Sequence, residues 1–229
     1  MEKNGNGLGL LLRNIILGGQ DGLVNVLGII LGVATATKST NLVLLAGLAA
    51  TFAESVSMAA VAYTSTRAEE EHYQSVVKSE KEQIEKRPNE ARSDIEKIYS
   101  SKGFSGSLLD QVVDKVCSNK KVWLTTMMRE ELHLEDPSEN MSPTKQGIIV
   151  GGSAIIGSLI PVAPFFFVGV EQAINIALVI SMLTLFLVGA YKSKITSGSW
   201  LKGGLELMII GGAAALAGWL VGVLFKVQV

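Results

Sequence analysis

Residues 10–37 read LLLRNIILGGQDGLVNVLGIILGVATAT, a long apolar stretch that carries a single acidic residue, Asp21, near its middle. About 20 mostly apolar residues are enough for a helix to cross a bilayer. A helix is the economical structure there, because it satisfies its own backbone hydrogen bonds in lipid. The stretch is long and lacks an A-x-A-like cleavage site, so it predicts a permanent membrane span and not a signal peptide.

Four further stretches have the same character, and the chain therefore predicts an all-α integral membrane protein with five transmembrane helices. Glycines recur in the first, third and fifth spans, and small residues let membrane helices approach closely. We interpret them as packing positions. The four further spans are expected at residues 41–66, 146–168, 173–191 and 205–225.

The charged residues are concentrated in one part of the chain. Between Arg67 and Asn140 lie 16 of the 21 acidic and 12 of the 20 basic residues. We therefore expect three regions: spans 1 and 2 in residues 1–66, a polar segment in 67–145, and spans 3 to 5 in 146–229. The net charge of −1 gives no indication of nucleic-acid binding. The single cysteine, Cys117, cannot form an internal disulfide, which suits a reducing compartment.

The basic residues outside the polar segment also predict an orientation. Lys3 and Arg13 open the first span, and Lys192, Lys194 and Lys202 flank the loop between spans 4 and 5. With five spans, these positions and the polar segment fall on one side of the membrane. Because basic loops stay in the cytoplasm, we expect the N-terminus and the polar segment to be cytoplasmic.

The polar segment itself has the composition of short helices. Pro88 is expected to end a helix that continues from the second span, and Asn89 and Ser107 are candidate N-caps. The predicted helices cover residues 67–86, 89–101, 107–120 and 121–134.

Two carboxylates lie inside the apolar spans, Asp21 in the first and Glu54 in the second. An ionised carboxylate in a membrane costs at least about 2.5 kcal/mol, so the default hypothesis is a cation or proton path. The alternative is a hydrogen bond between helices or a protonated acid. Met58 lies one turn after Glu54, and a thioether beside a carboxylate suits Fe²⁺ or Mn²⁺. Asn25, one turn after Asp21, offers another oxygen ligand.

A second candidate metal site lies in the polar segment. Its acids and thioethers share helix faces at spacings of three or four residues, and converging helices would bring them to one or more metals. On composition alone, the interleaved Lys and Arg favour a solvated, salt-bridged surface instead. The candidate ligands are Glu82, Glu85, Glu96, Met127, Met128 and Glu131.

A competing pattern places Glu and His three residues apart twice. Glu69 with His72, and Glu130 with His133, have the spacing found in di-iron carboxylate bundles. The alternative function is therefore a membrane-anchored iron-binding buffer or a di-iron ferroxidase that transports nothing. A small-solute carrier is a third possibility.

Several segments together resemble the vacuolar iron transporter family. The resemblance covers nearly the whole chain, and the order and spacing of the segments make it specific. They are GGQDGLVNVLGIILG at residues 18–32, SMAA at 57–60, GSLIPVAPF at 157–165 and GAYKSKITSGSWLKGGLE at 189–206.

The resemblance implies a homodimer of five-span subunits with an ion path at the two-fold axis. It implies that Fe²⁺, with Mn²⁺ as an alternative cargo, leaves the cytosol in exchange for protons. Asp21 matches the first-span acid and Met58 the second-span methionine, and Glu54 is the candidate carboxylate of that helix. No resident cofactor or enzymatic activity is implied.

The same resemblance implies that the polar segment is a cytoplasmic metal-binding domain. The six candidate ligands of the polar segment match its Glu set and its Met-Met-x-x-Glu motif. One further Glu of the family falls on Ser93, where Glu90 or Asp94 would substitute for it. The host membrane would be a plasma membrane in a prokaryote and a vacuolar membrane in a eukaryote. The sequence does not rank Fe²⁺, Mn²⁺, Co²⁺ and Zn²⁺ as cargo.

Overall fold

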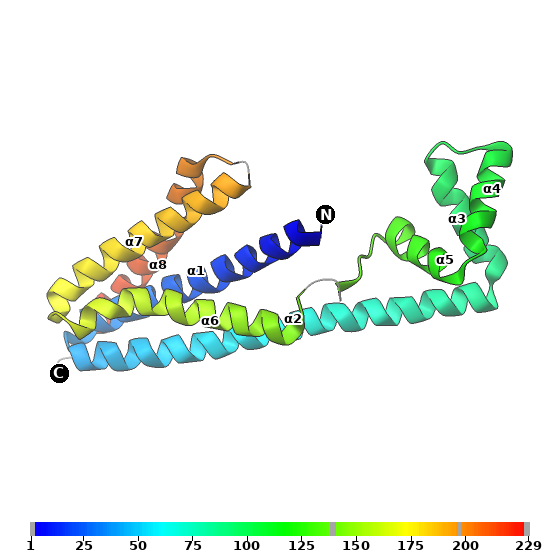
Figure 1. Ribbon diagram of the computed structural model, residues 1–229. Helices are drawn as coiled ribbons and strands as arrows, with labels where there is room; N and C mark the ends of the chain where they lie inside the picture. Colours follow the sequence, from blue (N-terminus) through cyan, green and yellow to red (C-terminus); the bar gives the residue numbers. More distant parts are fainter. Residues whose placement is uncertain (1–2, 138–140, 197, 227–229) are drawn as a thin grey trace. The chain divides into compact units, whose positions relative to one another are not determined.

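A computed structural model describes residues 3–137, 141–196 and 198–226, and every regular element in these ranges is a helix (Figure 1). Five of the helices are long and apolar enough to cross a membrane. The prediction of an all-α protein with five candidate spans is therefore confirmed. These helices are α1 (Lys3–Thr37), α2 (Thr40–Lys86), α6 (Pro143–Val162), α7 (Val170–Ile195) and α8 (Trp200–Leu224).

The chain divides into two compact units. The membrane unit comprises Met1–Thr64 and Ser142–Val229, and the polar unit comprises Ser65–Met141. Helix α2 contributes its first part to the membrane unit and its remainder to the polar unit. The expected region boundaries at residues 67 and 145 lie close to those of the two units.

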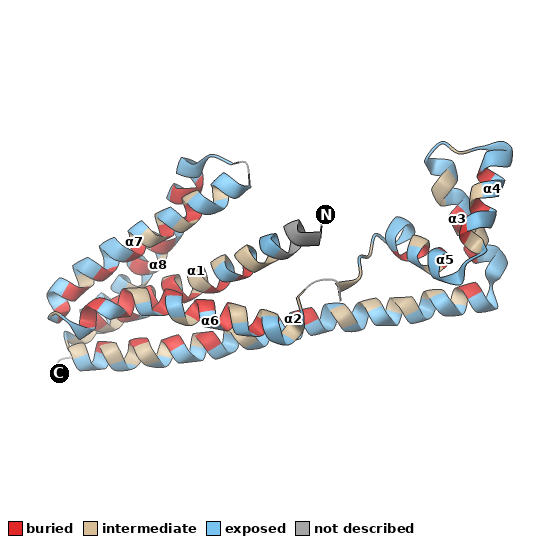
Figure 2. Ribbon diagram, viewed as in Figure 1, coloured by how far each residue is buried: buried red, intermediate tan, exposed pale blue. Residues whose placement is uncertain are grey.

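Helix α1 packs against three other helices of the membrane unit, α6, α7 and α8. Its residues Val26, Leu27, Ile30 and Ala34 are completely buried, which explains why this helix is apolar on several faces. Most of the surface of α7 and α8 is exposed, including large apolar side chains, as expected for helices that face lipid (Figure 2).

Glycines allow the close helix crossings of the membrane unit. A Cβ at Gly157 of α6 would collide with the carbonyl group of Gly19 in α1. In the same way, a Cβ at Gly218 of α8 would collide with the carbonyl group of Gly28 in α1. The prediction that glycines mark helix-packing positions is confirmed at these crossings.

The polar unit contains three short α-helices and a π-helix, packed on the distal part of α2. They are α3 (Pro88–Ser101), α4 (Gly106–Cys117), α5 (Lys120–Thr126) and the π-helix η1 (Met127–Glu131). Their buried core includes Ile84 of α2, Ile95 of α3, Val113 of α4 and Trp123 of α5. This core gives the unit an interior of its own.

The helix starts in the polar unit differ from the expected caps. Asn89 is not an N-cap, because Pro88 already occupies the first turn of α3 and Arg87 is the N-cap. Ser105, not Ser107, precedes α4. Helix α5 is capped by the side chain of Asn119, which accepts hydrogen bonds from the backbone N–H groups of Lys121 at 3.0 Å and Val122 at 3.3 Å.

Candidate functional site

Three polar side chains meet between the first two spans. The Asn25 amide nitrogen of α1 donates a hydrogen bond to Glu54 Oε1 of α2, with a distance of 3.0 Å between the two atoms. The Asp21 carboxyl group lies close enough to Glu54 and Asn25 for both side chains to act on it. The two acids predicted inside the membrane are therefore brought together, and Asn25 joins them.

This group lies deep in the spans. Asp21 precedes the end of α1 at Thr37 by 16 residues, or about 24 Å of helix. Glu54 follows the start of α2 at Thr40 by 14 residues, or about 21 Å. The hydrocarbon core of a bilayer is about 30 Å thick. Measured from these helix ends, both carboxylates lie within a layer of that thickness, in the third of it farthest from those ends.

In the single chain, part of this polar group is exposed at the surface. Asp21 and Glu54 are half-buried, and Asn25 is exposed. No ion pair recorded among the described residues involves either acid, so no lysine or arginine neutralises them in this way. Met58, one turn after Glu54 on α2, is half-buried as well. An uncompensated polar group at this depth requires a polar covering, because lipid offers no partner for it.

Three acids of the polar unit influence one another electrostatically. Glu131 of η1 is close enough to Asp94 of α3 and Glu80 of α2 for their charges to act on it. Partial burial, together with the negative charges of Asp94 and Glu80, raises the pKa of Glu131, and Lys97 partly offsets the effect. Lys97 itself lies 2.8 Å from the Asp94 carboxylate. We call Glu80, Asp94 and Glu131 the inner acid set.

The predicted partners of Glu131 lie elsewhere on the surface. Glu82 forms an exposed ion pair with Lys86 at 2.9 Å, which lowers the pKa of Glu82. Glu85 lies 3.7 Å from Lys120 of α5. Glu96 is exposed on α3. The salt-bridged surface, which composition favoured, is thus what the structure shows for Glu82 and Glu85. Of the two acids considered as substitutes at Ser93, Asp94 belongs to the inner acid set, whereas Glu90 pairs with Arg87 at 3.4 Å.

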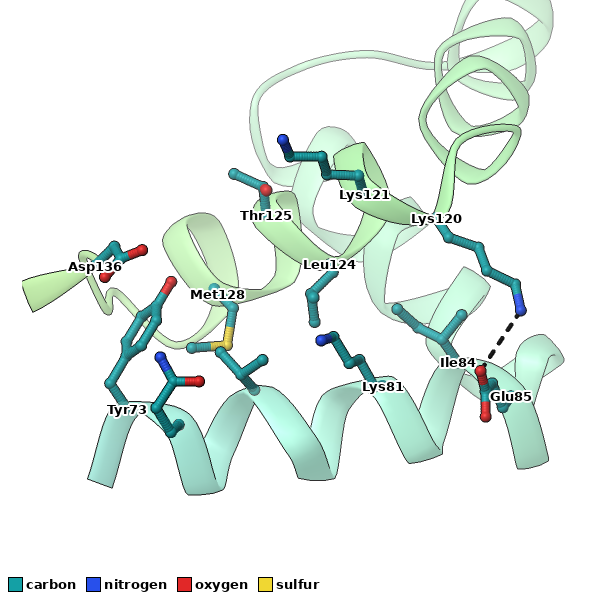
Figure 3. Close-up of a pocket in the computed structure, with 12 residues that line it drawn as sticks. Tyr73, Lys81, Ile84, Glu85, Lys120, Lys121, Leu124, Thr125, Met128 and Asp136 are labelled. Atoms are coloured by element: carbon teal, nitrogen blue, oxygen red, sulfur yellow. Dashed lines mark ion pairs between the residues drawn. The ribbon is translucent and has the colours of Figure 1, made fainter. Parts of the chain in front are cut away.

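The two methionines of η1 are almost fully buried. Met127 belongs to the core of the polar unit. Met128 lines a cleft of about 530 Å³ between α2 and α5, together with Tyr73 and Leu124. Figure 3 shows its thioether extending toward α2, beside Tyr73. Short π-helical segments are frequent at functional sites, and the five residues of this one include Met127, Met128 and Glu131.

The similarity to known proteins covers nearly the whole chain. The sequence profile of the VIT family matches residues 12–223. The chain belongs to the VIT family. It is 31% identical over 212 residues to vacuolar iron transporter 1 of Oryza sativa subsp. japonica, which covers 92% of this chain and 84% of that protein. It is 29% identical over 209 residues to vacuolar iron transporter 1 of Tulipa gesneriana, covering 91% and 84%. Protein CCC1 of Saccharomyces cerevisiae is 26% identical over 217 residues, covering 91% and 67%.

Membership of the VIT family, a family of membrane transporters, confirms the resemblance found in the sequence. One of its segments, GGQDGLVNVLGIILG, supplies Asp21 and Asn25 to the polar group, and Glu54 lies on α2 three residues before the segment SMAA. Sequence reasoning anticipated both acids. It identified Asn25 only as a possible oxygen ligand, whereas in the structure the amide nitrogen of Asn25 faces Glu54.

The Glu-x-x-His pattern gains no support from the geometry of this VIT family member. Glu130 is paired with Lys102, and the His133 ring lies 3.3 Å from the carbonyl oxygen of Arg129. Within the described ranges, no three or more His, Cys, Asp or Glu side chains are grouped so that they could hold a metal ion. A metal site formed by the inner acid set therefore needs other ligands as well, and methionine sulfur or amide oxygen is available in this chain.

Proposed function

We propose that this protein transports a divalent metal ion, with Fe²⁺ as cargo and Mn²⁺ as an alternative, out of the cytosol in exchange for protons. The observation that carries the proposal is the meeting of Asp21, Asn25 and Glu54 at the depth of the bilayer core. Carboxylate oxygens bind divalent cations, and Met58 adds a thioether one turn away. The relatives named vacuolar iron transporters support iron as cargo and a vacuolar membrane as location.

The chemistry of the two carboxyl groups, Asp21 and Glu54, accounts for the proposed exchange of metal for protons. A hydrogen bond between two carboxyl groups requires a proton on one of them. A divalent cation binds the deprotonated forms, so its arrival releases the proton. A proton that returns from the opposite side of the membrane then displaces the metal. The proton and the cation thus alternate on the same oxygens.

The open face of the polar group supports a homodimer. A single chain leaves Asn25 exposed and both acids half-buried at a depth where lipid cannot hydrogen-bond them. A second copy of the same face would cover the group and double its ligands, giving a path between two subunits.

The polar unit is proposed to collect the metal on the cytoplasmic side, where the basic residues predict that it lies. The inner acid set supplies three carboxylates, and Met127 and Met128 lie in the same π-helix as Glu131. This assignment replaces Glu82, Glu85 and Glu96, which the structure leaves exposed, with Glu80 and Asp94.

The test is metal uptake by proteoliposomes under an imposed proton gradient, with Fe²⁺ and Mn²⁺ compared. We expect wild-type protein to couple uptake to proton movement and Asp21→Ala to reduce the rate to the level of empty vesicles. Glu171→Gln is the matched control, because Glu171 is an exposed acid at the start of α7 that pairs with Lys38 at 3.7 Å. Normal uptake by Asp21→Ala would exclude the proposed path, and metal binding without any coupled proton flux would indicate a buffer.

A further inference from the structure

Asn25 is the one neutral member of the polar group, and its amide faces an acid of the neighbouring helix. The amide nitrogen of Asn25 donates to Glu54 Oε1 at 3.0 Å. Asp21 lies one turn before Asn25 on α1, close enough for Asn25 and Glu54 to act on its carboxyl group. The side chain of Asn25 therefore links α1 to the acid of α2, beside the acid of its own helix.

This orientation is opposite to that of a metal ligand. An amide ligates a cation through its oxygen, whereas here the nitrogen faces Glu54. Each hydrogen bond from the amide uses a carboxylate lone pair that a cation would otherwise occupy. The amide occupies one of about four lone-pair sites on the Glu54 carboxylate, and a cation that binds Oε1 at that site displaces it.

We infer that Asn25 is a positioning residue, which holds Asp21 and Glu54 together in the metal-free state and competes with the cargo for their oxygens. The inference rests on the proposed function. Asn25 would weaken metal binding, since part of the binding free energy is used to break its hydrogen bonds. It would also speed release, because the amide is ready to re-form those bonds as the ion departs.

The test is the dependence of proteoliposome uptake on Fe²⁺ concentration in Asn25→Ala and Asn25→Asp. We expect Asn25→Ala to lower KM by about threefold to tenfold, the net value of a typical hydrogen bond. The kcat should fall as well, because release becomes slower. Asn25→Asp keeps the shape but cannot donate, so its KM should fall too.

Two results would overturn the inference. A raised KM in Asn25→Ala with a normal KM in Asn25→Asp would show that Asn25 contributes a ligand oxygen. An unchanged KM in both variants would show that the amide does not compete with the metal. Asn175→Ala is the control, since Asn175 lies on α7 and its amide only donates to the backbone of its own helix, at 3.2 Å to the Glu171 carbonyl.

A measurement without transport covers the case of an inactive variant. The rise in Tm of detergent-solubilised protein on addition of Mn²⁺ reports metal binding alone. At a fixed Mn²⁺ concentration, this rise should be larger for Asn25→Ala than for wild type, and an equal or smaller rise contradicts the inference. Failure of the proposed function has a different signature, because wild-type vesicles would then take up no metal.

Discussion

At the scale of single residues, Glu131 gives the polar unit a specific pH dependence. Its raised pKa means that the folded state takes up a proton more readily than the unfolded state. The stabilising contribution is therefore complete below the ordinary value of 4.5 and is lost as the pH rises through the raised value. In metal-free protein at pH 7, Glu131→Gln should raise the Tm of the polar unit by about 2 °C. At pH 4 the two proteins should melt together.

Trp123, buried in the core of the polar unit, provides the measurement. With Trp200 and Trp219 replaced by Phe, fluorescence follows this unit alone. Glu82→Gln is the matched control, because the pKa of Glu82 is lowered by Lys86, and loss of an exposed ion pair has little effect on Tm. A Tm at pH 7 that is lower in Glu131→Gln than in wild type would contradict the proposed repulsion.

The inner acid set can be distinguished from the outer acids by metal binding. Glu80→Gln combined with Asp94→Asn should weaken Mn²⁺ binding to the purified protein by at least about tenfold, because it removes two of three converging carboxylates. Glu82→Gln combined with Glu85→Gln removes the same charge from the exposed surface and should leave that affinity unchanged. Calorimetric titration measures both. Equal losses in the two double variants would mean that net charge, and not a site, attracts the metal.

On α2 and α3, the acids that the sequence predicts as ligands differ from the acids that lie near Glu131 in the structure, for a geometric reason. Glu80 and Asp94 are spaced like Glu82 and Glu96, so spacing fits either pair. A shift of two residues turns a helix by about 200°, which places the two pairs on opposite faces. On α2, the buried Ile84 lies one turn after Glu80, which favours a core-facing position for Glu80. On α3, the buried Ile95 is adjacent to both Asp94 and Glu96, so the sequence does not distinguish these two acids.

At the scale of elements, the glycines at the helix crossings are predicted to leave no room for a side chain. Gly157→Ala should drive a Cβ into the carbonyl group of Gly19 and lower stability by about 1–3 kcal/mol. Gly152→Ala, on the same helix, meets nothing within 4 Å and should be neutral or stabilising, because alanine favours a helix. Thermal unfolding in detergent compares them. A Gly157→Ala protein as stable as Gly152→Ala would show that α1 and α6 do not cross there.

Element positions were largely predictable because each span must be long and apolar in its own right. The first two spans end and begin within a residue or two of the expected positions, separated by Lys38 and Ser39. What composition did not show was local chain geometry. Asn119 caps α5 although Lys121 was expected to begin that helix, and η1 interrupts the α-helical pattern at Met127. A π-helix adds one residue to a turn without any distinctive residue type.

At the scale of the whole molecule, the proposed homodimer makes a prediction about which face is covered. Ile29 lies one turn after Asn25 on α1 and is 43% exposed in the single chain, and Val179 on α7 is 65% exposed. If a second copy covers the polar group, only the first position faces a partner, whereas Val179 faces lipid. In a Cys117→Ser background, Ile29→Cys should therefore give a covalent dimer with a short bis-maleimide in native membranes. Val179→Cys should remain monomeric, and the reverse pattern would place the interface on α7 and leave Asp21 and Glu54 without the proposed covering.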